Sequence, residues 1–165
     1  MALRLAKIAL VFALALYYSL VVFNNLTDYD SNYQFVRHVL MMDTTFPSNH
    51  GMWRALDSPV WHTVFFVSII AWETGTMVLC WWGGIRLAKA LGAPPSAFHL
   101  AKSVAISGLT LGLLMWLVAF LSVGSEWFLM WQSKAWDGRE AAFRIFTVQG
   151  VILLLLALPD VDPQP

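Results

Sequence analysis

Residues 60–82 form an apolar stretch that is long enough to cross a lipid bilayer, yet it holds a glutamate near its middle. A hydrocarbon core of about 30 Å takes about 20 helical residues, so a helix here places Glu73 near the midplane. His62 then falls in the outermost turn, and Trp81 and Trp82 fall at the opposite end. An ionisable side chain at this depth is costly and requires a partner or a function. Any fold of this chain must accommodate that carboxyl group.

Three further apolar stretches complete a set of four predicted membrane-spanning helices. The composition agrees, because 59% of the residues are hydrophobic and only 12% are charged, whereas soluble domains carry about 25% charged residues. The first stretch follows a basic residue, as in a signal peptide, but no small-x-small cleavage site follows it, so we expect a span. The sequence predicts an all-α fold: a four-helix transmembrane bundle in a single integral membrane domain, residues 1–165, with spans over residues 5–24, 60–82, 102–124 and 141–158.

The connections between these spans differ in character. Residues 24–59 make a longer link than is usual between helices, and within it apolar residues recur at near-helical spacing from 32 to 42. This pattern predicts an amphipathic helix that lies on the membrane surface or packs over the ends of the spans. We therefore expect a long, partly helical first outer loop. After the second span, Gly83 begins a basic linker, and residues 160–165 form a polar tail too short to fold alone.

The orientation rests on the first span. Lys and Arg residues divide equally between the two sides of the membrane, so their number alone is uninformative. Arg4 and Lys7 flank the first span, which usually dominates, and this favours a cytoplasmic N-terminus. Four spans then place the C-terminus on the same side. Five tryptophans fall at the outer interface, where they would anchor the depth of the bundle: Trp53, Trp61, Trp127, Trp131 and Trp136.

Glu73 is the central residue of a candidate polar site inside the membrane. It has no Lys or Arg at its own depth, so we expect it to be protonated and to bond to Gln149 in the fourth span. Tyr17 and Thr110 supply further hydrogen-bonding groups on neighbouring spans. Such a network is either purely structural or a site for a proton, a cation or a quinone. Replacing Glu73 by Gln separates the two, since a structural bond survives it and proton-dependent activity does not.

Other motifs have mainly structural interpretations. Gly108 and Gly112 form a G-x-x-x-G pair, which lets another helix approach closely, either within the bundle or in an oligomer. The single cysteine, Cys80, excludes an intrachain disulfide and a site built from several cysteines. The histidines lack a recognised metal-ligand spacing. We predict no cofactor and no metal, while haem, quinone or metal binding stays open.

Polar and aromatic residues gather in the two predicted outer loops. Glu126, at the end of the third span, and Arg144, at the start of the fourth, are placed to form an ion pair across the hairpin. Asp137 and Glu140 resemble a cap for the fourth span. The full candidate cluster on the outer face consists of His38, Asp43, His62, Glu126, Trp127, Trp131 and Arg144.

Two strings in these loops, FVRHVLMMDT at 35–44 and EWFLMWQS at 126–133, carry a family resemblance. With NNLTDYD at 24–30 and with Glu73, they make nearly the whole chain similar to a bacterial family of predicted small integral membrane proteins. The resemblance implies a four-span, multi-pass protein of the bacterial inner membrane with both motif-bearing loops on one face. It implies no activity, cofactor or catalytic residue. Asp-Gly-Arg at 137–139 departs from the family, which more often has Asn and Gln there, and this puts in doubt any role that needs a neutral side chain.

Three function classes are consistent with these features. The favoured one is a non-enzymatic accessory or scaffold subunit of a membrane complex, given the small size and the lack of a nucleophile or phosphate loop. The second is a binding or transport module, which requires Glu73 to face a void. The third is a membrane enzyme, which requires His38, Asp43, His62 and Glu126 to converge. Zero net charge without a basic run predicts no nucleic-acid partner; membrane lipids, other proteins or further copies of the chain are the expected partners.

Overall fold

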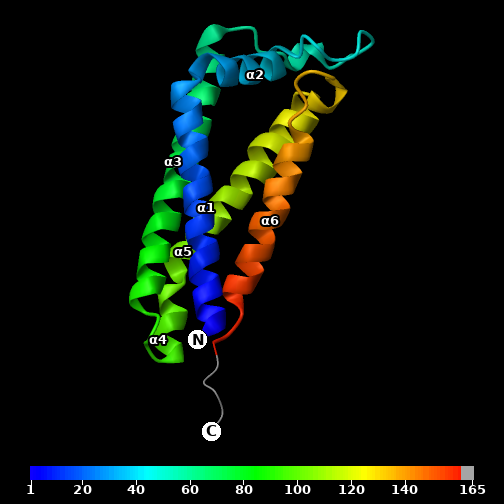
Figure 1. The fold of residues 1–165 in the computed structure, drawn as a ribbon. Coiled ribbons are helices and arrows are strands. Elements are labelled where there is room, and N and C mark those ends of the chain that lie inside the picture. Colours follow the sequence, from blue (N-terminus) through cyan, green and yellow to red (C-terminus); the bar gives the residue numbers. More distant parts are fainter. Residues whose placement is uncertain (161–165) are drawn as a thin grey trace.

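Four long helices form an upright bundle in the computed structural model, which describes residues 1–160 (Figure 1). They are α1 (Ala2–Thr27), α3 (Pro59–Lys89), a third rod built from α4 (Pro95–Ala101), α5 (Ser103–Leu114) and η2 (Met115–Trp127), and α6 (Arg139–Ala157). All four are long and apolar enough to cross a membrane. Residues 1–160 contain no β-strand. The predicted all-α fold with four spans is therefore confirmed.

The outer end of the bundle is closed by α2 (Tyr29–Met41), which lies across the tops of the spans (Figure 1). Only Asp28 separates α2 from α1, so the two helices meet at a sharp corner. The rest of this end consists of the loops around two short 3-10 helices, η1 (Met52–Arg54) and η3 (Met130–Gln132). The N-terminus, α4 and the end of α6 lie together at the opposite end. We call these the outer and inner ends.

Glycines determine how closely the helices pack. Gly83 does not begin a linker, as the sequence suggested, because α3 continues to Lys89. A Cβ atom at Gly83 would lie 2.5 Å from the backbone of Ala105 in α5, so the glycine permits a close helix crossing. Gly108 likewise faces Leu79 and Cys80 of α3, with 3.0 Å to the Cβ of Leu79. Gly83, where the sequence predicted that a linker begins, is thus a packing position within the bundle.

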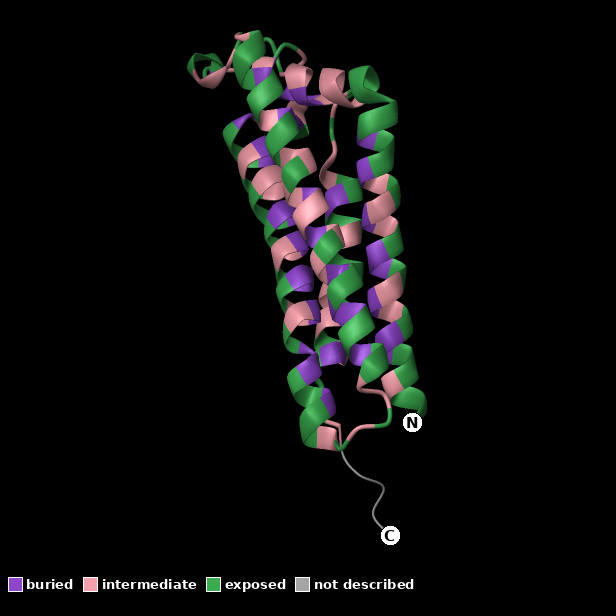
Figure 2. Ribbon diagram, turned by 90° about the vertical axis from the view of Figure 1, so that its left-hand side faces the viewer, coloured by how far each residue is buried: buried purple, intermediate pink, exposed green. Residues whose placement is uncertain are grey.

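Gly112 lies over the side chains of Tyr18 and Gln149, and like Gly108 it is buried. The G-x-x-x-G pair therefore serves contacts inside one chain. An oligomer interface built on these two glycines, which the sequence left open, is wrong. Buried residues face the bundle interior and exposed ones face outward along all four rods (Figure 2). The outward faces carry large apolar side chains such as Leu16 and Leu154, which suits contact with lipid.

The inner end is fastened by a buried ion cluster. The ammonium group of Lys7 pairs with Oδ1 of Asp160 at 3.0 Å, and that of Lys102 pairs with Oδ2. Both lysines also donate to the carbonyl oxygen of Leu158, at 2.8 Å and 2.7 Å. These contacts join α1, the junction of α4 and α5, and the end of α6. Asp160 is therefore held in place, contrary to the expectation of a free tail; the remainder of that tail, 161–165, lies outside the described residues.

The outer half of the third rod, η2, is a π-helix, in which backbone groups pair five residues apart. The amide of Phe128 donates to the carbonyl of Val123 at 3.0 Å, and the hydroxyl of Ser122 donates to the carbonyl of Leu117 at 2.8 Å. π-helical segments are rare, usually a single turn, and frequent at functional sites. This one covers Met115–Trp127 and borders the two cavities described below.

Candidate functional site

Glu73 lies halfway along α3 and points into the bundle, with only 2% of its surface exposed. Its Oε2 accepts a hydrogen bond of 2.6 Å from the side-chain amide of Asn25, in the last turn of α1. The predicted bond between Glu73 and Gln149 is wrong. The sequence placed both residues at suitable depths, but it could not show that Gln149 faces a different group of helices.

Gln149 belongs to a separate network that joins three rods of the bundle. Its Oε1 accepts from the hydroxyl of Tyr18 at 2.7 Å, and its Nε2 donates to the carbonyl of Leu109 at 2.6 Å. The indole of Trp116 donates to the same hydroxyl at 2.9 Å. These buried polar groups satisfy one another, as a structural network requires. Thr110, which the sequence assigned to the Glu73 site, is exposed on the outward face of α5.

A cavity of about 530 Å³ separates Glu73 from the lipid-facing surface. This volume lies within the range of about 300–1,000 Å³ that is usual for small-molecule sites. Tyr17, also assigned to the site from the sequence, borders it. The lining residues come from α1, α2, α3, η2 and the start of α6: Tyr17, Leu20, Val21, Asn24, Asn25, Asn32, Phe35, Val36, Phe66, Ile69, Glu73, Trp116, Phe120, Gly138 and Ala141.

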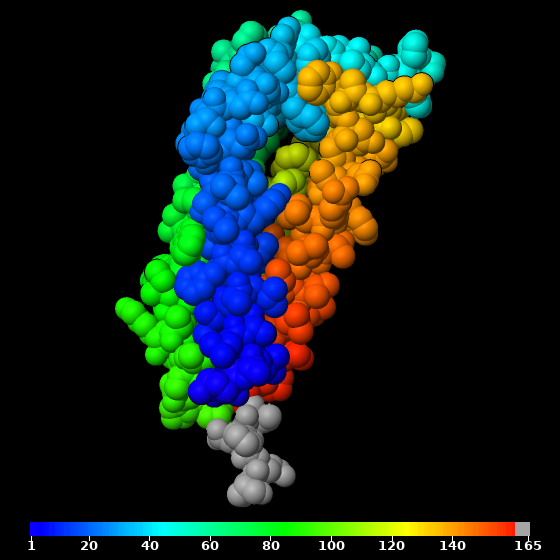
Figure 3. Space-filling view, in the orientation of Figure 1, coloured from blue at the N-terminus to red at the C-terminus, as the bar shows by residue number. Residues whose placement is uncertain are grey.

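The cavity opens sideways, between α1 and α6. These helices are joined toward the inner end by the Lys7–Asp160 and Tyr18–Gln149 contacts, and they diverge toward the outer end (Figure 1). Figure 3 shows the resulting hollow between them, with η2 visible behind. Exposed lining residues, Leu20 on α1 and Ala141 on α6, mark the two sides of the opening. A ligand would therefore enter from the membrane.

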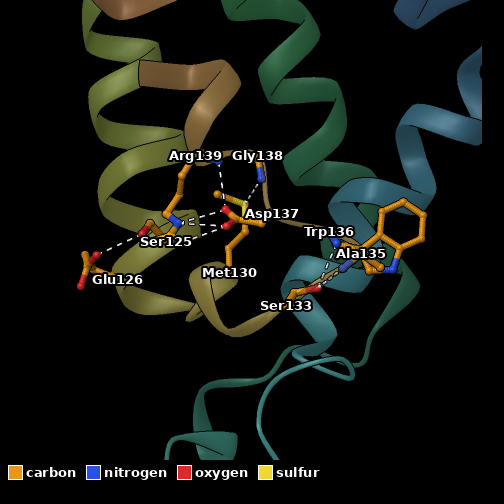
Figure 4. Close-up of polar contacts among 9 residues, drawn as sticks. All are labelled: Ser125, Glu126, Met130, Ser133, Ala135, Trp136, Asp137, Gly138 and Arg139. Carbon is orange, nitrogen blue, oxygen red and sulfur yellow. Dashed lines mark hydrogen bonds and ion pairs between the residues drawn. The ribbon is translucent and has the colours of Figure 1, made fainter. Parts of the chain in front are cut away.

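The rim on the α6 side is shaped by a tight turn (Figure 4). Asp137 accepts from the backbone amide of Arg139 at 3.1 Å and forms an ion pair with its guanidinium at 2.8 Å. Hydrogen bonds from Arg139 hold the pKa of Asp137 below its ordinary value. The amide of Gly138 approaches the sulfur of Met130 at 3.4 Å, and a Cβ atom at Gly138 would lie 2.9 Å from the ring of Phe35. Glycine at this position lets α2 close over the rim.

The charges around the start of α6 differ from the sequence prediction. Arg144 pairs with Glu140, one turn away, at 2.7 Å, so the predicted ion pair between Arg144 and Glu126 is wrong. An ion pair at this spacing lies along one helix face, whereas the predicted pair would have bridged two helices. Glu126 instead accepts from the hydroxyl of Ser125 at 3.0 Å.

A second cavity of about 270 Å³ lies between α2, α3 and η2. Phe35, Val36, Ile69 and Phe120 line both cavities and so form the partition between them. The rings of Phe35 and Phe120 stack with centroids 6.5 Å apart. The second cavity is lined almost wholly by apolar side chains, with Ser68 and Trp72 as the exceptions, and it offers no charged partner among its lining residues.

The outer-face cluster predicted from the sequence divides into separate parts. His38 and Asp43 do meet, with Nδ1 and Oδ2 2.7 Å apart, and the His38 ring stacks on Trp136 with centroids 4.6 Å apart. His62 is buried and its Nε2 donates to the carbonyl of Leu56 at 2.7 Å. No three His, Cys, Asp or Glu side chains of residues 1–160 gather closely enough to hold a metal ion. Of the four residues that an outer-surface enzyme would use, His38 and Asp43 are the pair joined by a side-chain hydrogen bond within residues 1–160.

The tryptophans of this cluster join the two outer loops. Trp127 packs edge-on against Trp53 with centroids 5.8 Å apart, and the guanidinium of Arg54 lies 5.6 Å from the Trp127 ring. Trp131 packs against Phe46 in the same manner, at 5.8 Å. These contacts hold the first loop to the turn between η2 and α6.

The sequence did not reveal the α1 and η2 residues that bind Glu73 and Gln149 or support those bonds. Asn25 binds Glu73, and Tyr18 and Trp116 bind one another. A signal for two of them was present, because Val11, Tyr18 and Asn25 are spaced seven residues apart and so share one helix face. All three are buried.

Comparison with known proteins identifies a family and nothing closer. Residues 3–159 match the family model described as "Predicted small integral membrane protein (DUF2165)". This match covers nearly all of the chain and confirms the resemblance carried by the two loop strings. No curated protein and no solved structure matches the chain.

Proposed function

Since the chain belongs to this family of predicted small integral membrane proteins, we propose that it is a membrane-embedded binding protein whose ligand occupies the cavity at Glu73. The observation that carries the proposal is the position of that carboxyl group. Glu73 is buried inside a bundle with four membrane-spanning helices, yet it borders a cavity instead of a packed interface. An ionisable group at such a place is by default a functional feature.

The surroundings of Glu73 support a binding role over a purely structural one. A structural network lies around Gln149, where each buried polar group has a protein partner. Glu73 has one hydrogen bond, to Asn25, among residues 1–160. Its second oxygen is therefore available to a ligand. This arrangement favours the binding module over the accessory subunit that the sequence alone favoured.

We place the protein in the inner membrane of a bacterium, with both termini in the cytoplasm. The basic residues that flank the first span support this orientation, and the N-terminus lies at the same end of the bundle as the end of α6 (Figure 1). The lateral opening then faces the outer leaflet, and α2 and the two outer loops lie at the periplasmic surface.

A substitution at the opening tests the proposal. Ala141→Trp places a large ring where α6 borders the cavity, whereas Ala157→Trp places the same ring on an exposed part of α6 away from it. The protein and both variants are extracted in a mild detergent, and bound small molecules are identified by native mass spectrometry. We expect the wild type and Ala157→Trp to carry one bound amphiphile per chain, and Ala141→Trp to carry less than a tenth of that amount.

Two results would contradict the proposal. One is a wild-type protein that is folded and carries no small molecule under any mild extraction. The other is a bound molecule that Ala141→Trp retains in full, since it would then occupy some other place. A stoichiometric protein partner with an empty cavity would instead support the accessory-subunit interpretation.

A further inference from the structure

We propose that the ligand of the Glu73 cavity is a lipophilic cation, a protonated amine or quaternary onium ion with apolar substituents. This inference rests on the proposed function and names the chemical class that the cavity would take. It follows from the charge of the lining, from its aromatic content and from the direction of its opening.

The charge of the lining is negative or neutral. Glu73 is the only acidic residue among the fifteen described residues that line the cavity, and none of the fifteen is Lys or Arg. A fatty acid or an anionic phospholipid would bring a second negative charge into a poorly hydrated space without a counter-ion, at a high desolvation cost. A cation would find its counter-ion in Glu73, whose carboxyl group, expected to be protonated in the empty cavity, would release its proton when the cation binds. The bond from Asn25 leaves one carboxylate oxygen to receive it.

The aromatic residues of the lining add a second attraction for a cation. Five of the lining side chains are aromatic, and they come from four different elements: Tyr17, Phe35, Phe66, Trp116 and Phe120. Trp116 and Phe120 stand one turn apart on η2, with ring centroids 4.8 Å apart. The faces of such rings attract onium ions, most strongly when water is excluded. The combination of one carboxylate with several rings is suited to a bulky cation.

The direction of entry restricts the cation further. The opening lies between α1 and α6 and faces the membrane, so the ligand must partition into lipid before it binds. Arg139, which follows the rim residue Gly138, has its guanidinium paired with Asp137 and does not present an unpaired positive charge there. A small hydrated ion is therefore disfavoured, and a cation shielded by apolar groups is favoured.

Equilibrium binding of tritiated tetraphenylphosphonium to the purified protein in mild detergent tests this inference. Tetraphenylborate has nearly the same shape and the opposite charge, so it serves as the matched probe. We expect saturable binding of one tetraphenylphosphonium per chain, and no saturable binding of tetraphenylborate in separate samples. Glu73→Gln should weaken the affinity at least tenfold, while Glu126→Gln, at an exposed carboxylate outside the cavity, should leave it unchanged.

A second variant controls for the possibility that Glu73→Gln loses binding only because it folds poorly. Ala141→Trp leaves Glu73 intact and should also weaken tetraphenylphosphonium binding at least tenfold, whereas Ala157→Trp should not. Equal binding of both probes, or full affinity in Glu73→Gln, would overturn the cation inference while leaving the cavity as a binding site. A wild-type protein that binds neither probe, and that carries no small molecule from the membrane, would overturn the proposed function itself.

Discussion

Asp160 forms ion pairs with two buried ammonium groups at once, those of Lys7 and Lys102. Burial alone would raise the pKa of Asp160, but hydrogen bonds from Lys102 and Lys7 outweigh it and hold that pKa below its ordinary value. The side chain is only 3% exposed, so solvent screens these pairs weakly. Buried pairs of this kind are costly to break from one side, because the remaining charge stays in a poorly hydrated place.

We expect Asp160→Asn to lower the free energy of unfolding by about 3–5 kcal/mol, since it leaves two buried ammonium groups without their anion. Asp137→Asn is the matched control: it breaks the more exposed pair with Arg139 and should cost at most about 1 kcal/mol. Denaturant unfolding in detergent micelles, followed by tryptophan fluorescence, measures both. Equal losses in the two variants would contradict the assignment.

The same carboxylate predicts a pH dependence. A carboxyl group whose pKa is lower in the folded state stabilises that state fully above its unfolded pKa, about 3.9 for Asp. The stability difference between the wild type and Asp160→Asn should therefore be constant from neutral pH down to about 4. It should shrink as the pH falls further, through the lowered pKa of Asp160. A difference that grows on acidification would show the opposite sign and refute the pairing.

At the scale of helices, the packing of the bundle requires glycines where two helices cross at short distance. Gly83 of α3 meets the backbone of Ala105 in α5, and Gly84 meets the ring of Phe12 in α1. Gly150 of α6, by contrast, has open space around the position of a Cβ atom. The chain thus offers a matched pair of helical glycines, one at a crossing and one on a free surface.

Gly83→Ala should destabilise the protein by about 1–3 kcal/mol, because its methyl group overlaps the α5 backbone and forces the helices apart. Gly150→Ala should be neutral or stabilise by up to about 1 kcal/mol, since alanine favours the helix and meets no neighbour. Thermal unfolding of the two variants beside the wild type checks both signs. A neutral Gly83→Ala would mean that the crossing is wider than described.

Much of the helical architecture follows from apolar length and amphipathic spacing. The four spans were predictable because a bilayer requires a long apolar run, and α2 was predictable because an interface imposes a helical period. The end of the second span was not predictable from the sequence. Gly83 resembles a helix terminator, and only the contact with α5 explains why a glycine stands inside the helix. The π-helix of η2 was not predictable either, because its hydrogen bonds leave no distinct residue pattern.

The candidate site was predictable only in its central residue. Glu73 is easily recognised as a charged residue within the apolar stretch 60–82. Its depth along α3 follows from the number of residues on either side. Its partner depends on how α1 and α6 are rotated about their axes, which residue counting cannot determine. Asn25 therefore replaces Gln149 as the neighbour of Glu73. The cavity itself arises from the divergence of α1 and α6, a property of several helices together.

For the molecule as a whole, the arrangement of ends predicts a labelling pattern. Asp57 is exposed near the outer end and Ser96 is exposed near the inner end, while the native Cys80 is fully buried. On intact bacterial cells, a membrane-impermeant maleimide should label Asp57→Cys and leave Ser96→Cys unlabelled. Permeabilised cells should label both, and the wild type should stay unlabelled throughout. The reverse pattern would place the termini and the cavity opening on the opposite sides from those proposed.

The ion cluster of Lys7, Lys102 and Asp160 also bears on how the chain is made. The two lysines enter the membrane with the first and third spans, before the ribosome has synthesised the aspartate that neutralises them. Until the residues that follow the fourth span are made, these two ammonium groups lack the carboxylate of Asp160. We therefore expect a chain truncated before Asp160 to be less stable than the full chain, and to be degraded faster by membrane proteases.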